Sequence, residues 1–209
     1  MKKSKRPSHV PGRLLFGGME MDVRIRRAVL KDAPELLEIY RHYVLHTAVT
    51  FEYEVPSVEE FQSRMCRIMQ KYPYLVAEAE GRIIGYAYAG PFHARAAYGW
   101  AAEMTVYLDH RCKGKGAGRK LYEALEKALG EMGVLNLYAC IGVPEEEDEY
   151  LSFASERFHE HMGFVRNGFF RRCGYKFGRW YHMIWMEKII GEHGNDQPPV
   201  RPFSQTVAF

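Results

Sequence analysis

A glycine-rich basic turn between a strand-like run and a helical run is the feature that most restricts what this chain can fold into. The run Gly99 to Leu108 alternates as a strand does, and Gly118 to Met132 has the apolar spacing of an amphipathic helix. The turn between them carries a cluster of cations, namely Arg111, Lys113, Lys115, Arg119 and Lys120. The fold must therefore place a strand directly before a helix whose N-terminus is strongly positive.

This turn has the properties of a phosphate cradle. Glycines allow consecutive backbone N–H groups to point at one anion, and a helix N-terminus adds partial positive charge. The passage lacks the GK[ST] ending of a Walker loop and the acidic residue of a dinucleotide fingerprint about twenty positions on. We expect it to bind the phosphates of a polyanionic ligand, and the alternative is a solvated turn that only caps the helix.

The first half of the chain predicts a strand, two helices and a hairpin. A strand at 22–27 precedes a helix for which Asp32 is a candidate N-cap, and Ser57 with Glu60 forms a capping-box pattern before a second helix. The stretches 74–80 and 83–89 alternate around the turn Glu80-Gly81, as the strands of a hairpin do.

The second half continues with alternating strands and helices. After the helix at 118–132 we expect a strand at 134–141, a helix at 150–161 ended by Gly163, and strands at 164–172 and 180–187 joined by a turn at 174–178. The whole order is β-α-α-β-β-β-α-β-α-β-β. It predicts an α/β domain built on one mixed sheet.

Composition limits the chain to one domain with short extensions. It has 209 residues, of which 47% are hydrophobic, enough for a single core. We expect a flexible leader at 1–20, the domain at 21–190, and a loose C-terminal tail at 191–209 that contains three prolines.

Charge and cysteine usage exclude several classes of protein. The 29 basic and 26 acidic residues leave a net charge of +3, too small to indicate a nucleic-acid partner. The sequence has neither an apolar run of membrane-spanning length nor a signal peptide, so we expect a cytoplasmic protein with no membrane partner. The four cysteines lack CxxC spacing, which favours reduced thiols and no metal site.

The segment Lys113-Gly114-Lys115-Gly116-Ala117-Gly118 resembles the (Q/R)-x-x-G-x-(G/A) pyrophosphate loop of the GNAT N-acetyltransferases, with Lys113 where Gln or Arg is usual. Further landmarks are similar to the phosphinothricin acetyltransferase branch of that family. They lie at 89–100, 103–107, 140–144, 157–160, 163–164 and 173–180, and the resemblance extends from about Val23 to Lys188.

The resemblance implies a fold and a co-substrate. It implies an α/β GNAT fold: one mixed, mostly antiparallel sheet of about seven strands, flanked by about four helices, with a splay between the fourth and fifth strands. It also implies acetyl-CoA as co-substrate. The residues that it places against acetyl-CoA are Val106, Tyr107, Leu108, Lys113, Gly114, Lys115, Gly116, Ala117, Gly118, Arg119, Ser152, Ser155 and His159.

Transfer of an acetyl group to an amine needs a base, because a primary amine has a pKa of about 10 and is protonated in water. The resemblance assigns this role to Glu103, and Met104 and Val106 indicate a buried setting that would raise its pKa. It places His159 where the family often has a tyrosine, so His159 either protonates the leaving thiolate or only packs against the cofactor. Ser152 stands where the family often has an asparagine.

On the acceptor side the resemblance implies a small amino acid or analogue, such as phosphinothricin or methionine sulfoximine, acetylated by direct attack within a ternary complex. The residues expected to contact it are Phe51, Glu52, Arg95, Tyr98 and Tyr175. The resemblance also implies a homodimer. Acetylation of a protein N-terminus, a lysine or a polyamine stays open, as does a non-catalytic acyl-CoA-binding module.

Overall fold

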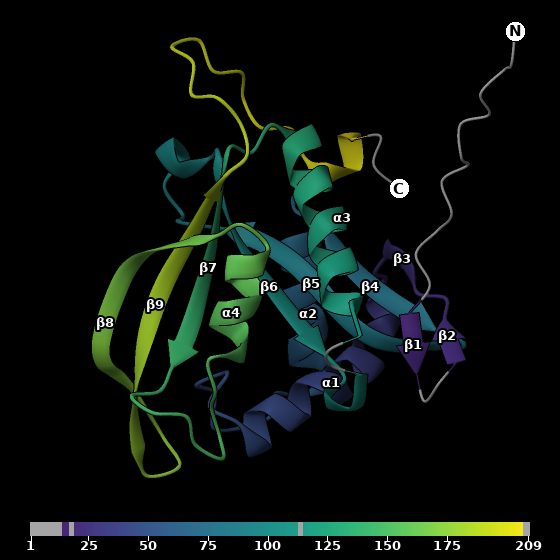
Figure 1. Ribbon diagram of the computed structural model, residues 1–209. Helices are drawn as coiled ribbons and strands as arrows, with labels where there is room; N and C mark the ends of the chain where they lie inside the picture. The colour runs from purple at the N-terminus through teal and green to yellow at the C-terminus, as the bar shows by residue number, and fades with distance from the viewer. Residues whose placement is uncertain (1–13, 17–18, 113–114, 207–209) are drawn as a thin grey trace, which may run out of the picture.

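A seven-stranded mixed sheet forms the centre of the molecule (Figure 1). The computed structural model describes residues 14–16, 19–112 and 115–206. The strand order across the sheet is β3-β4-β5-β6-β7-β9-β8, and all neighbours are antiparallel except β6 and β7. The bounds are β3 Arg24–Arg27, β4 Tyr74–Ala79, β5 Arg82–Pro91, β6 Ala101–Leu108, β7 Asn136–Val143, β8 Val165–Lys176 and β9 Arg179–Ile189.

Helices cover both faces of this sheet. They are α1 Ala33–His46, α2 Val58–Met69, α3 Ala117–Met132 and α4 Ala154–His161, and from β3 onward the order of helices and strands matches the predicted one. Leu75 and Ala77 of β4 pack with α3, whereas Tyr74 and Val76 pack with α1 and α2. Because side chains of a strand alternate between faces, β4 has a separate core on each side. In the part of the chain that the structure describes, no helix is both long and apolar enough to cross a bilayer.

Tight turns close the two hairpins. Glu80 and Gly81 link β4 to β5 with φ values of 51° and 77°, and Phe177 and Gly178 link β8 to β9 with 51° and 76°. Two successive positive φ values are those of a type I′ turn, whose twist suits antiparallel strands. The second turn is shorter than the predicted one at 174–178, because Gly174 lies within β8.

The parallel pair β6 and β7 separates soon after it begins, which confirms the predicted splay. Pairing joins only Ala101, Ala102 and Glu103 to residues 136–138, although β6 continues to Leu108 and β7 to Val143. From Glu103 onward the two strands diverge, and the facing edge of β6 has no strand partner. This opening is the main irregularity of the sheet.

Asp32 stands at the predicted N-cap position of α1, but its carboxylate makes no hydrogen bond to the helix and binds Arg26. It accepts hydrogen bonds from Arg26 at 2.7 and 3.1 Å and from the Val29 N–H at 2.9 Å, without a capping bond to the helix. A short 3₁₀ turn, Leu30–Asp32, leads directly into α1. Ser57 does cap α2 as predicted, since its hydroxyl oxygen accepts from the Glu60 N–H at 3.1 Å.

The ends of the chain differ from the expected extensions. Within the predicted leader, β1 Leu14–Phe16 and β2 Met19–Met21 pair as a small antiparallel sheet. The predicted tail is not loose over residues 198–206. The N–H of Arg201 donates to Met132 at 2.9 Å, and Phe203 is buried beneath the Arg27 guanidinium, 4.2 Å from its ring centre. Burial of this aromatic ring holds the segment against the domain.

Candidate active site

A cavity of about 60 Å³ lies where β6 and β7 diverge. Both strands, α3 and α4 contribute to its wall. The lining comprises Val49, Met104, Thr105, Val106, Tyr107, Tyr122, Ala139, Cys140, Ile141, Gly142, Ser155 and His159. Four of the residues predicted to hold the cofactor, Val106, Tyr107, Ser155 and His159, therefore meet at one opening in the sheet.

The predicted pyrophosphate loop leads into α3 at the end of β6. Lys113 and Gly114 lie outside the described residues. Gly116 has a left-handed φ of 80°, a conformation that favours glycine, and the helix starts at Ala117. A Cβ added at Gly118 would lie 3.3 Å from Leu108 and 3.5 Å from Phe158, so a bare backbone here lets α3 approach both β6 and α4.

These features fit a long ligand with phosphates at one end and a thioester at the other. The first N–H groups of α3 have no carbonyl partner within the helix, and the basic residues Lys115 and Arg119 lie in or next to this first turn. From there the unpaired edge of β6 runs back towards Glu103. Leu108 is fixed at the outer end of this edge, since its carbonyl accepts a 2.7 Å hydrogen bond from Tyr43. The residues present therefore suit acetyl-CoA.

Glu103 is the last residue of β6 that pairs with β7. It is half-buried, and this burial raises the pKa of its carboxyl group. Its negative charge acts on Cys140 and Tyr122, which both line the cavity, and on Tyr88. A carboxylate of raised pKa thus stands at the inner end of the opening, where an acyl group and an amine would meet.

His159 is buried, with 3% of its surface exposed, and forms two hydrogen bonds. Its Nδ1 lies 2.7 Å from the Ser155 carbonyl and its Nε2 lies 2.8 Å from the Tyr122 hydroxyl. A carbonyl only accepts, so Nδ1 carries the proton and Nε2 accepts from Tyr122. Burial lowers the pKa of His159 to about 4, which keeps the ring neutral at physiological pH.

Ser152 and Ser155 have different positions, although both were expected at the cofactor. Ser155, in the first turn of α4, lines the cavity. Ser152 precedes the helix, and its hydroxyl oxygen lies 3.3 Å from the Ala154 N–H, as in a local turn. Ser152 does not line the cavity.

On the opposite side of β6, a second small cavity of about 80 Å³ lies beneath α1 and α2. Its polar groups are the Glu52 carboxylate and the Arg64 guanidinium, which pair at 2.6 Å, together with several tyrosines. The pKa of Tyr88, a wall residue, is raised by burial, and the nearby charges of Glu103 and of the Glu52–Arg64 pair also affect it. Glu52 is thus part of the same polar face as Glu103.

Phe51 and Tyr175 lie at the junction of the 47–57 loop with β8. Phe51 packs against Tyr181 and over Gly174, where an added Cβ would come within 2.3 Å of the Phe51 ring. The Tyr175 carbonyl accepts a hydrogen bond from the Tyr53 hydroxyl, whereas the Tyr175 ring is exposed and packs against Trp180. The contact of Tyr175 with the 47–57 loop is therefore made by its backbone carbonyl and not by its ring.

Arg95 and Tyr98 occupy the turn after β5. Arg95 is exposed and immediately precedes a 3₁₀ turn, Ala96–Tyr98. Tyr98 contacts Phe92 edge to face at 5.9 Å between ring centres. Since Gly90 pairs with Glu103, this turn follows β5 just beyond the predicted base.

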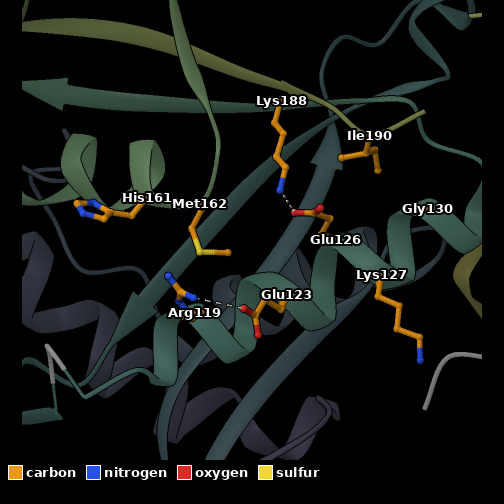
Figure 2. Close-up of a pocket in the computed structure, with 9 residues that line it drawn as sticks. All are labelled: Arg119, Glu123, Glu126, Lys127, Gly130, His161, Met162, Lys188 and Ile190. Atoms are coloured by element: carbon orange, nitrogen blue, oxygen red, sulfur yellow. Dashed lines mark hydrogen bonds and ion pairs between the residues drawn. The ribbon is translucent and has the colours of Figure 1, made fainter. Parts of the chain in front are cut away.

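A separate groove of about 440 Å³ lies along the outer side of α3, beside α4 and β9 (Figure 2). Figure 2 shows two of its charged pairs: Lys188 points at Glu126, 2.7 Å away, and Arg119 points at Glu123, 4.0 Å away. It shares no residue with the cavity at the splay. Of the predicted cofactor residues only Arg119 lines it.

Several residues of the site were not predicted. Tyr122 holds His159, but its position on the inner side of α3 marks it in the sequence only as a core residue. Arg64 lies on α2, far in sequence from Glu103. Lys176 does belong to the 173–180 stretch singled out in the sequence; it is 2% exposed, donates to the Thr50 carbonyl at 2.7 Å, and has a pKa lowered by burial to about 8. Among the described residues no group of three or more His, Cys, Asp or Glu side chains is arranged to hold a metal ion.

The fold and the opening at the splay define a class of protein, the CoA-dependent acyltransferases. Comparison with known proteins gives the family. The profile described as "Acetyltransferase (GNAT) domain" matches residues 25–185. The phosphinothricin N-acetyltransferase of Streptomyces viridochromogenes is 37% identical over 183 residues, which are 88% of this chain and 96% of that protein.

Two further relatives agree. The L-methionine sulfoximine/L-methionine sulfone acetyltransferase of Salmonella typhimurium is 32% identical over 81% of this chain and 95% of its own length. The crystal structure of a phosphinothricin acetyltransferase from Sinorhizobium meliloti in complex with AcCoA has a TM-score of 0.76 at 34% identity, covering 85% of this chain and 93% of that one. This chain belongs to the GNAT acetyltransferase family and is an acetyl-CoA-dependent N-acyltransferase.

Proposed function

We propose that this enzyme transfers the acetyl group of acetyl-CoA to the primary amine of a small amino acid or amino-acid analogue. The observation that carries the proposal is Glu103, a half-buried carboxylate of raised pKa at the point where the sheet opens. Relatives named for phosphinothricin and for methionine sulfoximine support an acceptor of this size.

In the proposed reaction the amine attacks the acyl group directly while both substrates are bound. Acetyl-CoA supplies an activated thioester. Glu103 takes a proton from the bound ammonium group, directly or through one water molecule, and its raised pKa makes it a stronger base than an exposed glutamate. A backbone N–H on the unpaired edge of β6 would stabilise negative charge on the acyl oxygen.

The state of Cys140 supports direct attack over an acyl-enzyme intermediate. Its thiol lines the cavity and would be the nucleophile of a covalent route. Partial desolvation and the charge of Glu103 raise the pKa of this thiol, although the Cys140 side chain is exposed. The thiolate is the reactive form, so Cys140 is a poor nucleophile at neutral pH.

We propose that His159 positions the cofactor arm and does not protonate the leaving thiolate. Its one proton is held by the Ser155 carbonyl, and its other nitrogen accepts from Tyr122. A ring with a pKa of about 4 has no second proton to give at neutral pH.

The structure gives little support to a polyamine acceptor, because the acidic residues that would bind one are paired. The acidic run at 145–149 would suit a polycation, but four of its five carboxylates pair with arginines within the domain. Glu145 pairs with Arg172, Glu147 with Arg157, and both Asp148 and Glu149 with Arg179, at 2.8–3.0 Å. Little free negative charge therefore remains there for a polycation.

A thiol-release assay with acetyl-CoA separates these acceptors. The panel contains amino acids, phosphinothricin, methionine sulfone, spermidine and a peptide with a free N-terminus. We expect turnover of at least one amino acid or analogue. Turnover of the peptide or spermidine alone would replace the proposal, and acetyl-CoA binding without any turnover would favour a binding module.

Two accompanying proposals concern the whole protein. We expect a homodimer and a cytoplasmic location. Sedimentation velocity should show a species of twice the 24.3 kDa chain mass, and a single-chain mass at micromolar concentration would reject the dimer.

A further inference from the structure

Glu103 has two different surroundings on its face of the sheet. Its strand neighbours at the same level are Gly90 on β5 and Tyr138 on β7. Paired residues of adjacent strands point to the same face. Towards α1 and α2 this face carries Tyr88 and the Glu52–Arg64 cavity, whereas in the other direction it carries a group of aromatic side chains.

That group, here termed the aromatic cluster, consists of Phe92, Tyr98, Tyr138 and Trp185. Phe92 is its centre. It stacks on Tyr138 with 4.1 Å between ring centres, and it meets Trp185 and Tyr98 edge to face at 5.3 and 5.9 Å. Phe92, Tyr138 and Trp185 are only partly buried, and Tyr98 is 40% exposed. Phe92, Tyr98 and Tyr138 also form a wall of a groove of about 320 Å³.

The floor between Glu103 and this cluster is open. Gly90 lies beside Glu103, and a Cβ built on Gly90 would meet no atom within 4 Å. The position has no positive φ that would require glycine. Space for a ligand atom therefore exists directly next to the predicted base and two residues from Phe92.

The charges beside the cluster disfavour an anionic side chain. Tyr138 lies between Glu103 and Glu187 in the pairing of the strands, and burial together with the Glu187 carboxylate raises the pKa of Tyr138. The cation of this end is Arg95, in the turn beyond Phe92, where it suits the α-carboxylate common to all amino acids.

We propose that the aromatic cluster, with the open floor at Gly90, is the side-chain subsite for an acceptor amino acid that carries a large neutral side chain, aromatic or sulfur-containing. The inference rests on the proposed amine acetylation and specifies which amino-acid side chains the enzyme prefers. The amine lies at Glu103 above Gly90, and the side chain packs along Phe92. Small or anionic acceptors do not use this contact.

The test measures kcat/KM for phenylalanine, methionine sulfone, alanine and phosphinothricin. The wild type should prefer the first two. Phe92→Ala should lower kcat/KM for phenylalanine and methionine sulfone by about tenfold or more, because an apolar contact of this size is lost, while alanine changes by less than about threefold. Phe169→Ala removes a more exposed aromatic side chain on β8, outside the aromatic cluster, and this control should leave the kcat/KM values unchanged.

A second variant tests the floor. Gly90→Ala adds a methyl group that touches no protein atom, so the melting temperature and acetyl-CoA affinity should be unchanged while KM for phenylalanine rises about tenfold. Gly130→Ala on α3, where the nearest atom is 4.0 Å away, is its control.

The outcomes separate the selectivity from the function. Equal losses for all acceptors in Phe92→Ala, or a wild-type preference for alanine or phosphinothricin, would overturn the subsite and leave amine acetylation intact. Absence of turnover with every amino acid would overturn both.

Discussion

At the scale of single residues, the site depends on groups whose charge is set by burial. Glu103 and His159 are both desolvated, and desolvation favours the neutral form of each. For a carboxylate this means a stronger base, and for an imidazole it means a ring that stays uncharged. The same physical cause thus makes one residue suited to proton transfer and the other to packing.

The neutral state of His159 predicts a pH dependence of stability. Its pKa is lowered from 6.5 to about 4, so between these values the unfolded chain binds a proton that the folded chain does not. The contribution of His159 is therefore complete above pH 6.5 and decreases by about 3 kcal/mol as the pH falls to 4.

Urea unfolding of wild type and His159→Gln at several pH values measures this effect. The variant should be less stable at pH 7 but should show a shallower decrease between pH 6.5 and 4. His161→Gln changes an exposed histidine of the same helix and should keep the wild-type slope. Parallel slopes for all three proteins would contradict a buried neutral His159.

At the scale of elements, the 47–57 loop packs against the β8–β9 hairpin, and both carry residues of the proposed acceptor side. Lys176 and Tyr175 of β8 hydrogen-bond to Thr50 and Tyr53, and Phe51 packs over Gly174. The loop therefore depends on a glycine in a strand that is otherwise far from it in sequence.

Gly174→Ala should displace this loop. The new Cβ would lie 2.3–2.8 Å from three atoms of the Phe51 ring, and overpacking of this kind costs about 1–3 kcal/mol. We expect a lower melting temperature and at least about a tenfold loss of acceptor kcat/KM, with acetyl-CoA affinity preserved.

Two further variants make the measurement specific. In Gly168→Ala, on the same strand, the new Cβ would lie 3.4 Å from its nearest neighbour, the Trp185 side chain. This variant should leave the melting temperature and kcat/KM nearly unchanged. Adding Phe51→Leu to Gly174→Ala should recover part of the lost stability. If the double variant is as unstable as the sum of both changes, the clash with Phe51 is not the cause.

Local patterns in the sequence predicted the elements but not their long-range partners. The turn at Glu80-Gly81 and the stop at Gly163 follow from residues that tolerate positive φ, and both are present. Asp32 occupies the predicted N-cap position of α1, but its carboxylate bonds to Arg26 and not to the helix. Helix α4 begins at Ala154 and not near Tyr150, because Asp148 holds the N–H groups of Tyr150 and Leu151 in a loop.

The site residues also divide into those found in local sequence motifs and those brought together only by the fold. Glu103 and the residues of the basic loop belong to contiguous motifs, so a resemblance was enough to predict roles for them. Tyr122 and Arg64 reach the site from other elements, and the folded arrangement alone brings them there. Sequence spacing contains no signal for such contacts, because each of these residues fits an ordinary helix or strand.

At the scale of the whole molecule, the C-terminal segment supports the domain core. Phe203 is 6% exposed and packs with the core on the α3 side of the sheet, while Trp100 donates to the Pro198 carbonyl at 2.7 Å. The segment therefore connects α3 with the turn that precedes β6.

Phe203→Ala should destabilise the protein without changing its chemistry. Loss of a buried phenylalanine costs about 3–5 kcal/mol, which corresponds to a decrease in Tm of roughly 6–20 °C for a chain of this size. Differential scanning calorimetry measures the shift, and kcat at 20 °C should stay within about twofold of wild type. An unchanged Tm would show that the segment does not contribute to the core.

The central claim is acetyl transfer to an amine with Glu103 as the base, and Glu103→Gln tests it most directly. The measurement is kcat/KM for the best acceptor against pH, in wild type and variant, with acetyl-CoA affinity as the control for folding. We predict that wild-type kcat/KM rises with pH as Glu103 loses its proton, and that the variant retains acetyl-CoA binding but loses about 10²–10⁴-fold in rate together with that rise. A variant with near wild-type rate and the same pH profile would contradict the claim.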